Sequence, residues 1–241
     1  MCEICGRKFS SMPSRRSVLG AAASTMGLLL ATAAGAKEMK TPPKPQNVLT
    51  PAGSLERLAK GNERYVAGVS LRHDFKHERD ALVGGQNPYA AILSCADSRV
   101  APEYAFDSGR GDLFVCRVAG NFANDETVAS LEYAVAVLGA PLILVLGHDS
   151  CGAVDAAIKS LKDGTTLPGH MPSLVAGIAP AVRAVSGQSG DILANAIKQN
   201  VIDNIARLRS ATPILSAAVE QGKLKVTGGI YRLGDGRVEL V

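Results

Sequence analysis

Residues 141–154, PLILVLGHDSCGAV, decide how this chain is expected to fold. The run Pro141–Leu146 is short, continuous and apolar, which is typical of a strand buried on both faces of a parallel sheet. It leads directly into Gly147–Gly152 (GHDSCG), and Ala153–Leu161 then has the residue spacing of a helix. A strand that enters a helix through a polar turn predicts an α/β fold, in which functional side chains gather where the strands end.

A second segment of the same design lies earlier in the chain. Tyr89–Ser94 (YAAILS) is an apolar strand, and it ends in Cys95-Ala96-Asp97-Ser98-Arg99. Because parallel strands place their carboxyl ends at one edge of a sheet, we expect this segment to meet residues 147–152 there. If the strand end stays extended, residues 95, 97 and 99 project toward the same side.

The remaining patterns predict a mainly parallel central β-sheet flanked by helices, with an antiparallel edge strand at the C-terminus. The further expected strands are Leu113–Val118, Leu224–Tyr231 and, after a hairpin turn at Gly234-Asp235-Gly236, Val238–Val241. The expected helices are Ser54–Gly68 with Ser54 as N-cap, Arg72–Asp80, Val128–Leu138, Ala153–Leu161, Asp191–Leu208 and Leu215–Gln221.

Residues 1–36 predict a twin-arginine signal peptide, and residues 37–52 a proline-rich linker before one domain at residues 53–241. Arg15 and Arg16 form the paired arginines, and the uncharged stretch that follows ends in small residues at Ala34-Gly35-Ala36, which suit a signal peptidase. A retained membrane anchor is the alternative, but the stretch is only weakly apolar. We therefore expect export to a periplasm or to the medium, with no stable membrane anchor after cleavage.

The charge balance gives no case for a nucleic-acid partner. The chain has 26 Lys and Arg against 22 Asp and Glu, but four of these bases and one acid lie within residues 1–36. The rest is nearly neutral and predicts no basic surface for phosphates. It contains three cysteines, Cys95, Cys116 and Cys151, which cannot all pair with one another, so metal ligation or a free thiol is needed.

Cys95, His148 and Cys151 are the candidate metal ligands. Two thiolates and one imidazole suit Zn²⁺, which prefers a tetrahedral set of such ligands. Three protein ligands leave a fourth position for water, substrate or a carboxylate such as Asp97, and an open position is typical of catalytic zinc. Alternatively, Cys151 is a nucleophile at a helix N-terminus, activated by His148, but Cys95 and Asp97 then have no role.

The sequence resembles the β-class carbonic anhydrases over about residues 53 to 241. The resemblance is carried by Cys95-Ala-Asp-Ser-Arg99 and His148-Asp-Ser-Cys151, within PYAAILSCADSRVAPEYAFDSGRGDLFVCRVAGN and ASLEYAVAVLGAPLILVLGHDSCGAV, and by GNERYVAG at Gly61–Gly68. It implies one zinc ion per chain on Cys95, His148 and Cys151. It also implies the reversible hydration of CO2 to bicarbonate and a proton.

The resemblance further assigns roles to residues around the metal. Asp97 accepts a hydrogen bond from the group in the open zinc position, and Arg99 holds that carboxylate in place. In some family members this aspartate moves onto the zinc at lower pH. Gln86 donates an amide hydrogen bond to the substrate, and Phe114 and Tyr133 give its pocket an apolar wall.

A homodimer or a tetramer also follows from the resemblance, since the N-terminal helix of the family packs across a neighbouring subunit. Two alternative functions remain. One is a hydrolase for CS2 or COS, which occurs on the same scaffold with the same zinc ligands. The other is a noncatalytic zinc-binding protein, but the presence of Asp97, Arg99 and Gln86 argues against it, because zinc binding alone does not need them.

Overall fold

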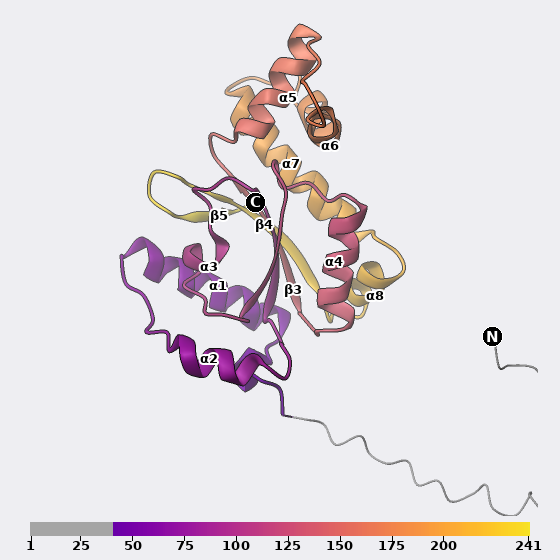
Figure 1. The fold of residues 1–241 in the computed structure, drawn as a ribbon. Coiled ribbons are helices and arrows are strands. Elements are labelled where there is room, and N and C mark those ends of the chain that lie inside the picture. The colour runs from indigo at the N-terminus through magenta and orange to yellow at the C-terminus, as the bar shows by residue number, and fades with distance from the viewer. Residues whose placement is uncertain (1–40) are drawn as a thin grey trace, which may run out of the picture. The chain divides into compact units, whose positions relative to one another are not determined.

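The computed structural model describes residues 41–241, so the predicted signal peptide at residues 1–36 lies outside the described residues. A five-stranded sheet of order β2-β1-β3-β4-β5 forms its centre (Figure 1). Strands β1 to β4 are parallel and β5 pairs antiparallel with β4, which confirms the predicted fold class. The strands are β1 (Ala90–Ser94), β2 (Leu113–Arg117), β3 (Leu142–His148), β4 (Lys225–Tyr231) and β5 (Val238–Leu240).

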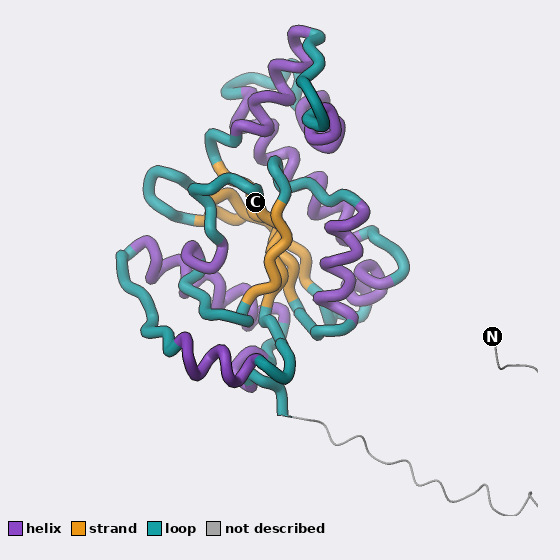
Figure 2. The backbone as a smooth tube through the Cα atoms, viewed as in Figure 1, coloured by secondary structure: helices purple, strands orange, loops and turns teal. Residues whose placement is uncertain are grey.

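Helices cover both faces of the sheet, as Figure 2 shows. Helices α4, α7 and α8 lie on one face, α1 and α3 lie on the other, and α5 and α6 pack with the N-terminal part of α7 beyond the carboxyl ends of the strands. The helices are η1 (Pro45–Asn47, a 3-10 turn), α1 (Pro51–Val66), α2 (Phe75–Leu82), α3 (Pro102–Ala105), α4 (Asp125–Ala136), α5 (Gly152–Asp163), α6 (Pro172–Ala184), α7 (Ile192–Arg209) and α8 (Ile214–Glu220).

The continuous apolar runs of the central strands follow from this layering. Successive residues of a strand point to opposite faces of a sheet. Accordingly, Leu93 and Ile143 pack under α4 and α7, whereas Ile92 and Leu144 pack under α1. All four side chains are at most 1% exposed. Because both faces are covered, every position in β1 and β3 is buried, and alternation with polar residues is absent.

The first long helix begins earlier than predicted. Ser54 was expected to cap it, but the helix starts at Pro51, and Thr50 Oγ1 accepts the capping hydrogen bond from Gly53 N at 3.1 Å. Proline fits the first helical position because it has no N–H to leave unpaired there. The predicted N-cap at Ser54 is therefore wrong, and its side chain is buried inside the first turn.

Part of the predicted linker packs against the domain. Lys44 and Asn47 are 7% and 3% exposed, and both donate hydrogen bonds to the carboxylate of Asp112 at the start of β2. The segment therefore runs along the amino ends of β1 and β2 and includes the short helix η1. Within residues 41–241, no helix has the length and apolar character needed to cross a membrane.

Candidate metal centre

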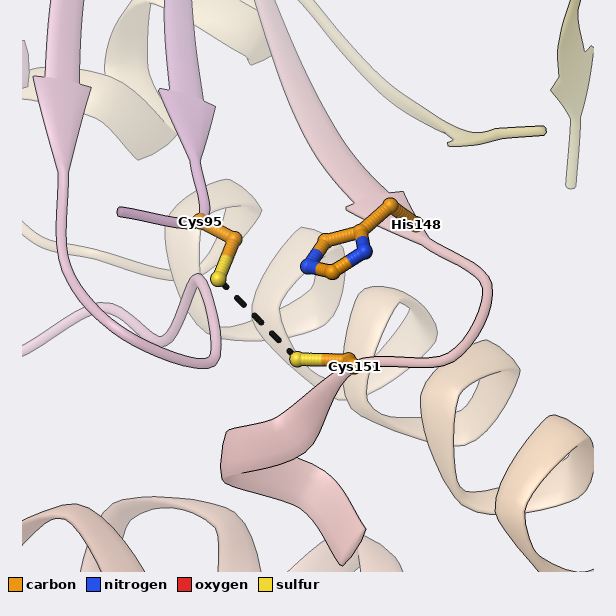
Figure 3. Close-up of side chains that lie close together, drawn as sticks. All are labelled: Cys95, His148 and Cys151. Carbon is orange, nitrogen blue, oxygen red and sulfur yellow. Dashed lines mark hydrogen bonds between the residues drawn. The ribbon is translucent and has the colours of Figure 1, made fainter. Parts of the chain in front are cut away.

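Three residues from three different elements meet at the carboxyl edge of the sheet. Cys95 directly follows β1, His148 is the last residue of β3, and Cys151 is the N-cap of α5. Their side chains point toward one another (Figure 3), and the two sulfur atoms lie 3.9 Å apart. One ligand atom from each residue lies within 4.8 Å of the other two, and all three residues are buried. The structure thus brings together the predicted ligand set.

The imidazole of His148 is prepared to bind a metal. Its Nδ1 donates to the backbone oxygen of Asp149 at 2.8 Å, which fixes the tautomer and leaves a lone pair on Nε2. Nε2 is buried and has no hydrogen-bond partner among the described residues. Because buried polar atoms are nearly always paired, this unpaired nitrogen beside two sulfurs fits a metal ion. The donor set, two sulfurs and one nitrogen, is the kind that zinc prefers.

The turn between His148 and Cys151 is held in an uncommon conformation. Ser150 has φ of 52°, in the left-handed region that non-glycine residues rarely adopt. Asp149 anchors this turn to the neighbouring strand, since its N–H donates to Tyr231 O at 3.1 Å and its Oδ1 accepts from Leu233 N at 3.0 Å. The left-handed residue directs the chain back, so that Cys151 faces the imidazole.

The two thiols lie within hydrogen-bonding distance of each other, and this contact shifts their pKa values in opposite directions. The hydrogen bond with Cys151, assisted by His148 and the Gly120 N–H, lowers the pKa of Cys95 to about 4. The same hydrogen bond and burial raise the pKa of Cys151. Burial lowers the pKa of His148, but its interactions with Cys95, the backbone of Asp149 and Asp97 together raise it. The lowered pKa of Cys95 favours its thiolate form, which is the form that binds a metal ion.

Asp97 and Arg99 form an ion pair next to these ligands. Arg99 donates to Asp97 Oδ1 from its backbone N and its Nε, both at 2.9 Å, and to Oδ2 from Nη2 at 2.7 Å. These hydrogen bonds hold the pKa of Asp97 far below its usual range, so the carboxylate stays charged. Its Oδ2 lies 3.8 Å from Nε2 of His148. The predicted pair is therefore in place beside the ligand atoms.

Arg117, at the end of β2, has a role that the sequence did not reveal. Its guanidinium donates to three backbone oxygens, those of Cys95 at 2.9 Å, Asp97 at 2.7 Å and Val100 at 2.7 Å. It therefore holds the loop that carries both a ligand and the carboxylate. In the sequence, Arg117 is only a basic residue at the end of a strand, and nothing in that pattern indicates a loop clamp.

The three predicted pocket residues lie elsewhere within a single chain. Phe114 pairs with Ala91 near the amino end of β1, and Cys95 follows four positions later at the carboxyl end. Phe114 packs against Tyr133 of α4 with ring centroids 6.4 Å apart, and Tyr133 is 48% exposed. Gln86 is exposed in the loop before β1. One chain thus does not bring these three side chains to the ligands.

Comparison with known sequences gives consistent matches. Residues 90–238 match the model of a protein family described as carbonic anhydrase. Carbonic anhydrase 2 of Mycobacterium tuberculosis is 41% identical over 196 residues, which cover 79% of this chain and 92% of that protein. A carbonic anhydrase of Pseudomonas aeruginosa is 38% identical over 173 residues, covering 66% of this chain and 76% of its own length.

Solved structures of similar fold carry the same description. The β-carbonic anhydrase CcaA matches with a TM-score of 0.59 and 30% identity, covering 76% of this chain and 93% of its own. A tetrameric β-carbonic anhydrase of the filamentous ascomycete Sordaria macrospora matches with a TM-score of 0.63 and 25% identity, covering 79% of this chain and 94% of its own.

Proposed function

The chain belongs to the carbonic anhydrase family, in its β class, and from this premise we propose that it catalyses the zinc-dependent, reversible hydration of CO2 to bicarbonate and a proton. The observation that carries the proposal is the buried, unpaired Nε2 of His148 beside the sulfurs of Cys95 and Cys151. These three residues would hold one zinc ion per chain. The chemistry that zinc supplies in such a site is Lewis-acid activation of water.

Asp97 would orient the reacting group. The carboxylate is fixed by Arg99 on one side, and Oδ2 faces the ligand nitrogen of His148. A fixed, charged acceptor at that position can accept a hydrogen bond from the reacting water. It can thereby orient a lone pair of the water oxygen toward the substrate carbon. Arg99 holds the carboxylate in this position through two hydrogen bonds, from Nε to Oδ1 and from Nη2 to Oδ2. Because two thiolates offset the charge of the ion, we expect activity to favour alkaline pH.

The pocket and the oligomer belong together in this proposal. Phe114 lies on β2, an edge strand of the sheet, and Tyr133 beside it remains about half exposed. Because Phe114 lies near the amino end of the sheet, away from the ligands of its own chain, a metal centre that this pair lines would belong to a neighbouring subunit. We therefore propose that Gln86, Phe114 and Tyr133 line the substrate pocket in a homodimer or tetramer. The tetrameric relative from Sordaria macrospora supports an oligomer.

Stopped-flow measurement of CO2 hydration by the purified mature protein tests the proposal, with CS2 and COS assayed in parallel. We expect about one zinc per chain and CO2 turnover at pH 8.5. Hydrolysis of CS2 without CO2 turnover would favour the hydrolase alternative. A folded, active preparation free of metal would contradict the zinc assignment, and zinc binding without any turnover would favour a noncatalytic protein.

Export by the twin-arginine route is a separate proposal that rests on residues outside the described part of the chain. The paired Arg15 and Arg16 precede an uncharged stretch that ends in small residues. Because this route carries folded proteins, zinc would be bound before export to a periplasm or to the medium. Replacing both arginines by lysine should retain the precursor in the cytosol, as a cell fractionation blot would show. Unchanged export would contradict the route.

A further inference from the structure

Helix α7 places two buried asparagine side chains beneath the loop that follows β2. Asn200 and Asn204 are 2% and 5% exposed, one helical turn apart on the same side of the helix. Nδ2 of Asn200 donates to the backbone oxygen of Gly120 at 2.8 Å, and Oδ1 of Asn204 accepts from Ala123 N at 2.7 Å. The helix therefore holds this loop at two points.

The same loop reaches a metal ligand. The backbone N–H of Gly120 donates to Sγ of Cys95 at 3.3 Å. Gly120 has φ of 86°, and a Cβ there would lie 2.4 Å from Cδ1 of Ile178, so only glycine fits this close approach. Gly120 thus makes two hydrogen bonds. Its N–H donates to the sulfur of Cys95, and its carbonyl oxygen accepts from the side chain of Asn200.

Asn204 fixes which way the amide of Asn200 points. Its Nδ2 donates to the backbone oxygen of Asn200 at 2.7 Å and to Oδ1 of Asn200 at 3.2 Å. With its oxygen engaged, Asn200 can only turn its NH2 group toward Gly120. The result is a continuous hydrogen-bonded chain from Asn204 through Asn200 and Gly120 to the sulfur of Cys95, and both asparagines are buried from solvent.

We propose that Asn200, oriented by Asn204, is a positioning residue that sets the hydrogen bond to the Cys95 thiolate and so tunes the metal centre. This inference rests on the zinc site of the proposed function. An N–H group directed at a metal-bound thiolate draws electron density from the sulfur and fixes its orientation. Without Asn200, the carbonyl of Gly120 loses its partner, the loop relaxes, and the sulfur loses its N–H donor.

Cobalt(II) substitution reads the sulfur directly, since the thiolate-to-cobalt charge-transfer band depends on the electron density of the sulfur. We expect the band of Asn200→Leu to move to lower energy than in the wild-type protein. Zinc affinity, measured by competition with a chromophoric chelator, should fall about 10- to 100-fold. Asn204→Ser should shift the band energy and the zinc affinity in the same directions, but by smaller amounts. If Asn200→Leu does not fold, Asn204→Ser provides the test instead.

Two control variants on α7 separate positioning from general loss of stability. Leu208→Ala lies on the same side of the helix, one turn beyond Asn204, and removes fully buried apolar contacts. Gln199→Leu makes the same chemical change as Asn200→Leu at a residue whose amide donates within the helix, to Asp203. Both controls should keep the wild-type band position and zinc affinity.

The outcomes distinguish this inference from the proposal on which it rests. A wild-type chain that shows no thiolate-to-cobalt band would overturn both the zinc site and the inference. A normal wild-type band that stays unchanged in Asn200→Leu and Asn204→Ser would overturn the inference alone. A band shift of equal size in Leu208→Ala would also overturn it, because loss of packing would then explain the effect.

Discussion

Two carboxylates at opposite ends of the central strands show how the same chemistry serves different purposes. Asp112, just before β2, accepts four hydrogen bonds: from Lys44 Nζ at 2.7 Å and Asn47 Nδ2 at 3.0 Å on Oδ1, and from Gly109 N at 2.9 Å and Arg57 Nη2 at 3.3 Å on Oδ2. With two donors on each oxygen, its accepting capacity is full. This carboxylate fastens the segment before α1 to the sheet.

Asp97, just after β1, is held by Arg99 alone. It accepts three hydrogen bonds, and its Oδ2 has one donor and faces the unpaired nitrogen of His148. The Arg99 side chain is 53% exposed, whereas that of Lys44 is 9% exposed. A carboxylate whose oxygens already accept all the hydrogen bonds they can, such as Asp112, stabilises the fold. A carboxylate that is held in place but can still accept a hydrogen bond, such as Asp97, can act on a bound group.

The largest expected effect is a loss of stability when Asp112 is replaced. Asp112→Ala leaves the Lys44 ammonium buried without its partner, which should lower the free energy of unfolding by about 3–5 kcal/mol. Urea titration followed by circular dichroism measures it. CO2 turnover by the folded fraction should stay near that of the wild-type protein. Replacing both residues, as Lys44→Met with Asp112→Leu, should restore part of the lost free energy of unfolding. A double variant as unstable as the single one would contradict the structural role of this ion pair and so the contrast with Asp97.

The second largest expected effect is a loss of activity when Asp97 is replaced. Asp97→Asn keeps the shape of the side chain but removes the charged acceptor, so kcat/KM for CO2 hydration should fall about 10- to 100-fold. Zinc content and the urea midpoint should remain close to those of the wild-type protein. Stopped-flow kinetics and metal analysis on one preparation check both parts. Near-normal turnover would show that Asp97 has no role in the reaction.

The smallest expected effect is on how stability depends on acidic pH when Arg99 is replaced. Arg99 holds the pKa of Asp97 low, so the pair stabilises the fold fully above the ordinary aspartate pKa of about 3.9, and this contribution is lost as pH falls through the lower pKa of the folded protein. Arg99→Gln should raise the pKa of Asp97 and remove that contribution. The stability difference between the metal-free proteins should be small at pH 7 and should narrow below about pH 4. A difference that grows in acid would contradict the sign.

Much of the fold could be predicted because its signals are local. The buried strands β1 and β3 are continuous apolar runs, and α7 has apolar residues at helical spacing. Helix α6 was not predicted, since Pro180 and Gly177 lie inside it and both residues normally interrupt helices. The burial of Lys44 could not be predicted either, because its partner Asp112 lies 68 residues away.

The site divides in the same way. Cys95, His148 and Cys151 were predicted because soft ligands at the ends of two strands form a pattern that spacing reveals. The residues that hold them gave no such signal. Arg117 acts through backbone oxygens, and Asn200 acts through a glycine 80 residues away, so only the folded chain shows what each one holds.

Two glycines under α7, Gly147 and Gly228, give a means of adjusting the metal centre by engineering. A Cβ at Gly147 would lie 2.7 Å from Val201 Cγ2, and one at Gly228 would lie 2.4 Å from Val201 Cγ1. A Cβ at Gly120, above the helix, would meet Ile178 instead. Alanine at Gly228 would press on the side chains of Val201 and Ile205 in α7, next to the asparagines whose hydrogen bonds lead to Cys95. A designer could thus vary how tightly the ion is held from a strand that contributes no ligand.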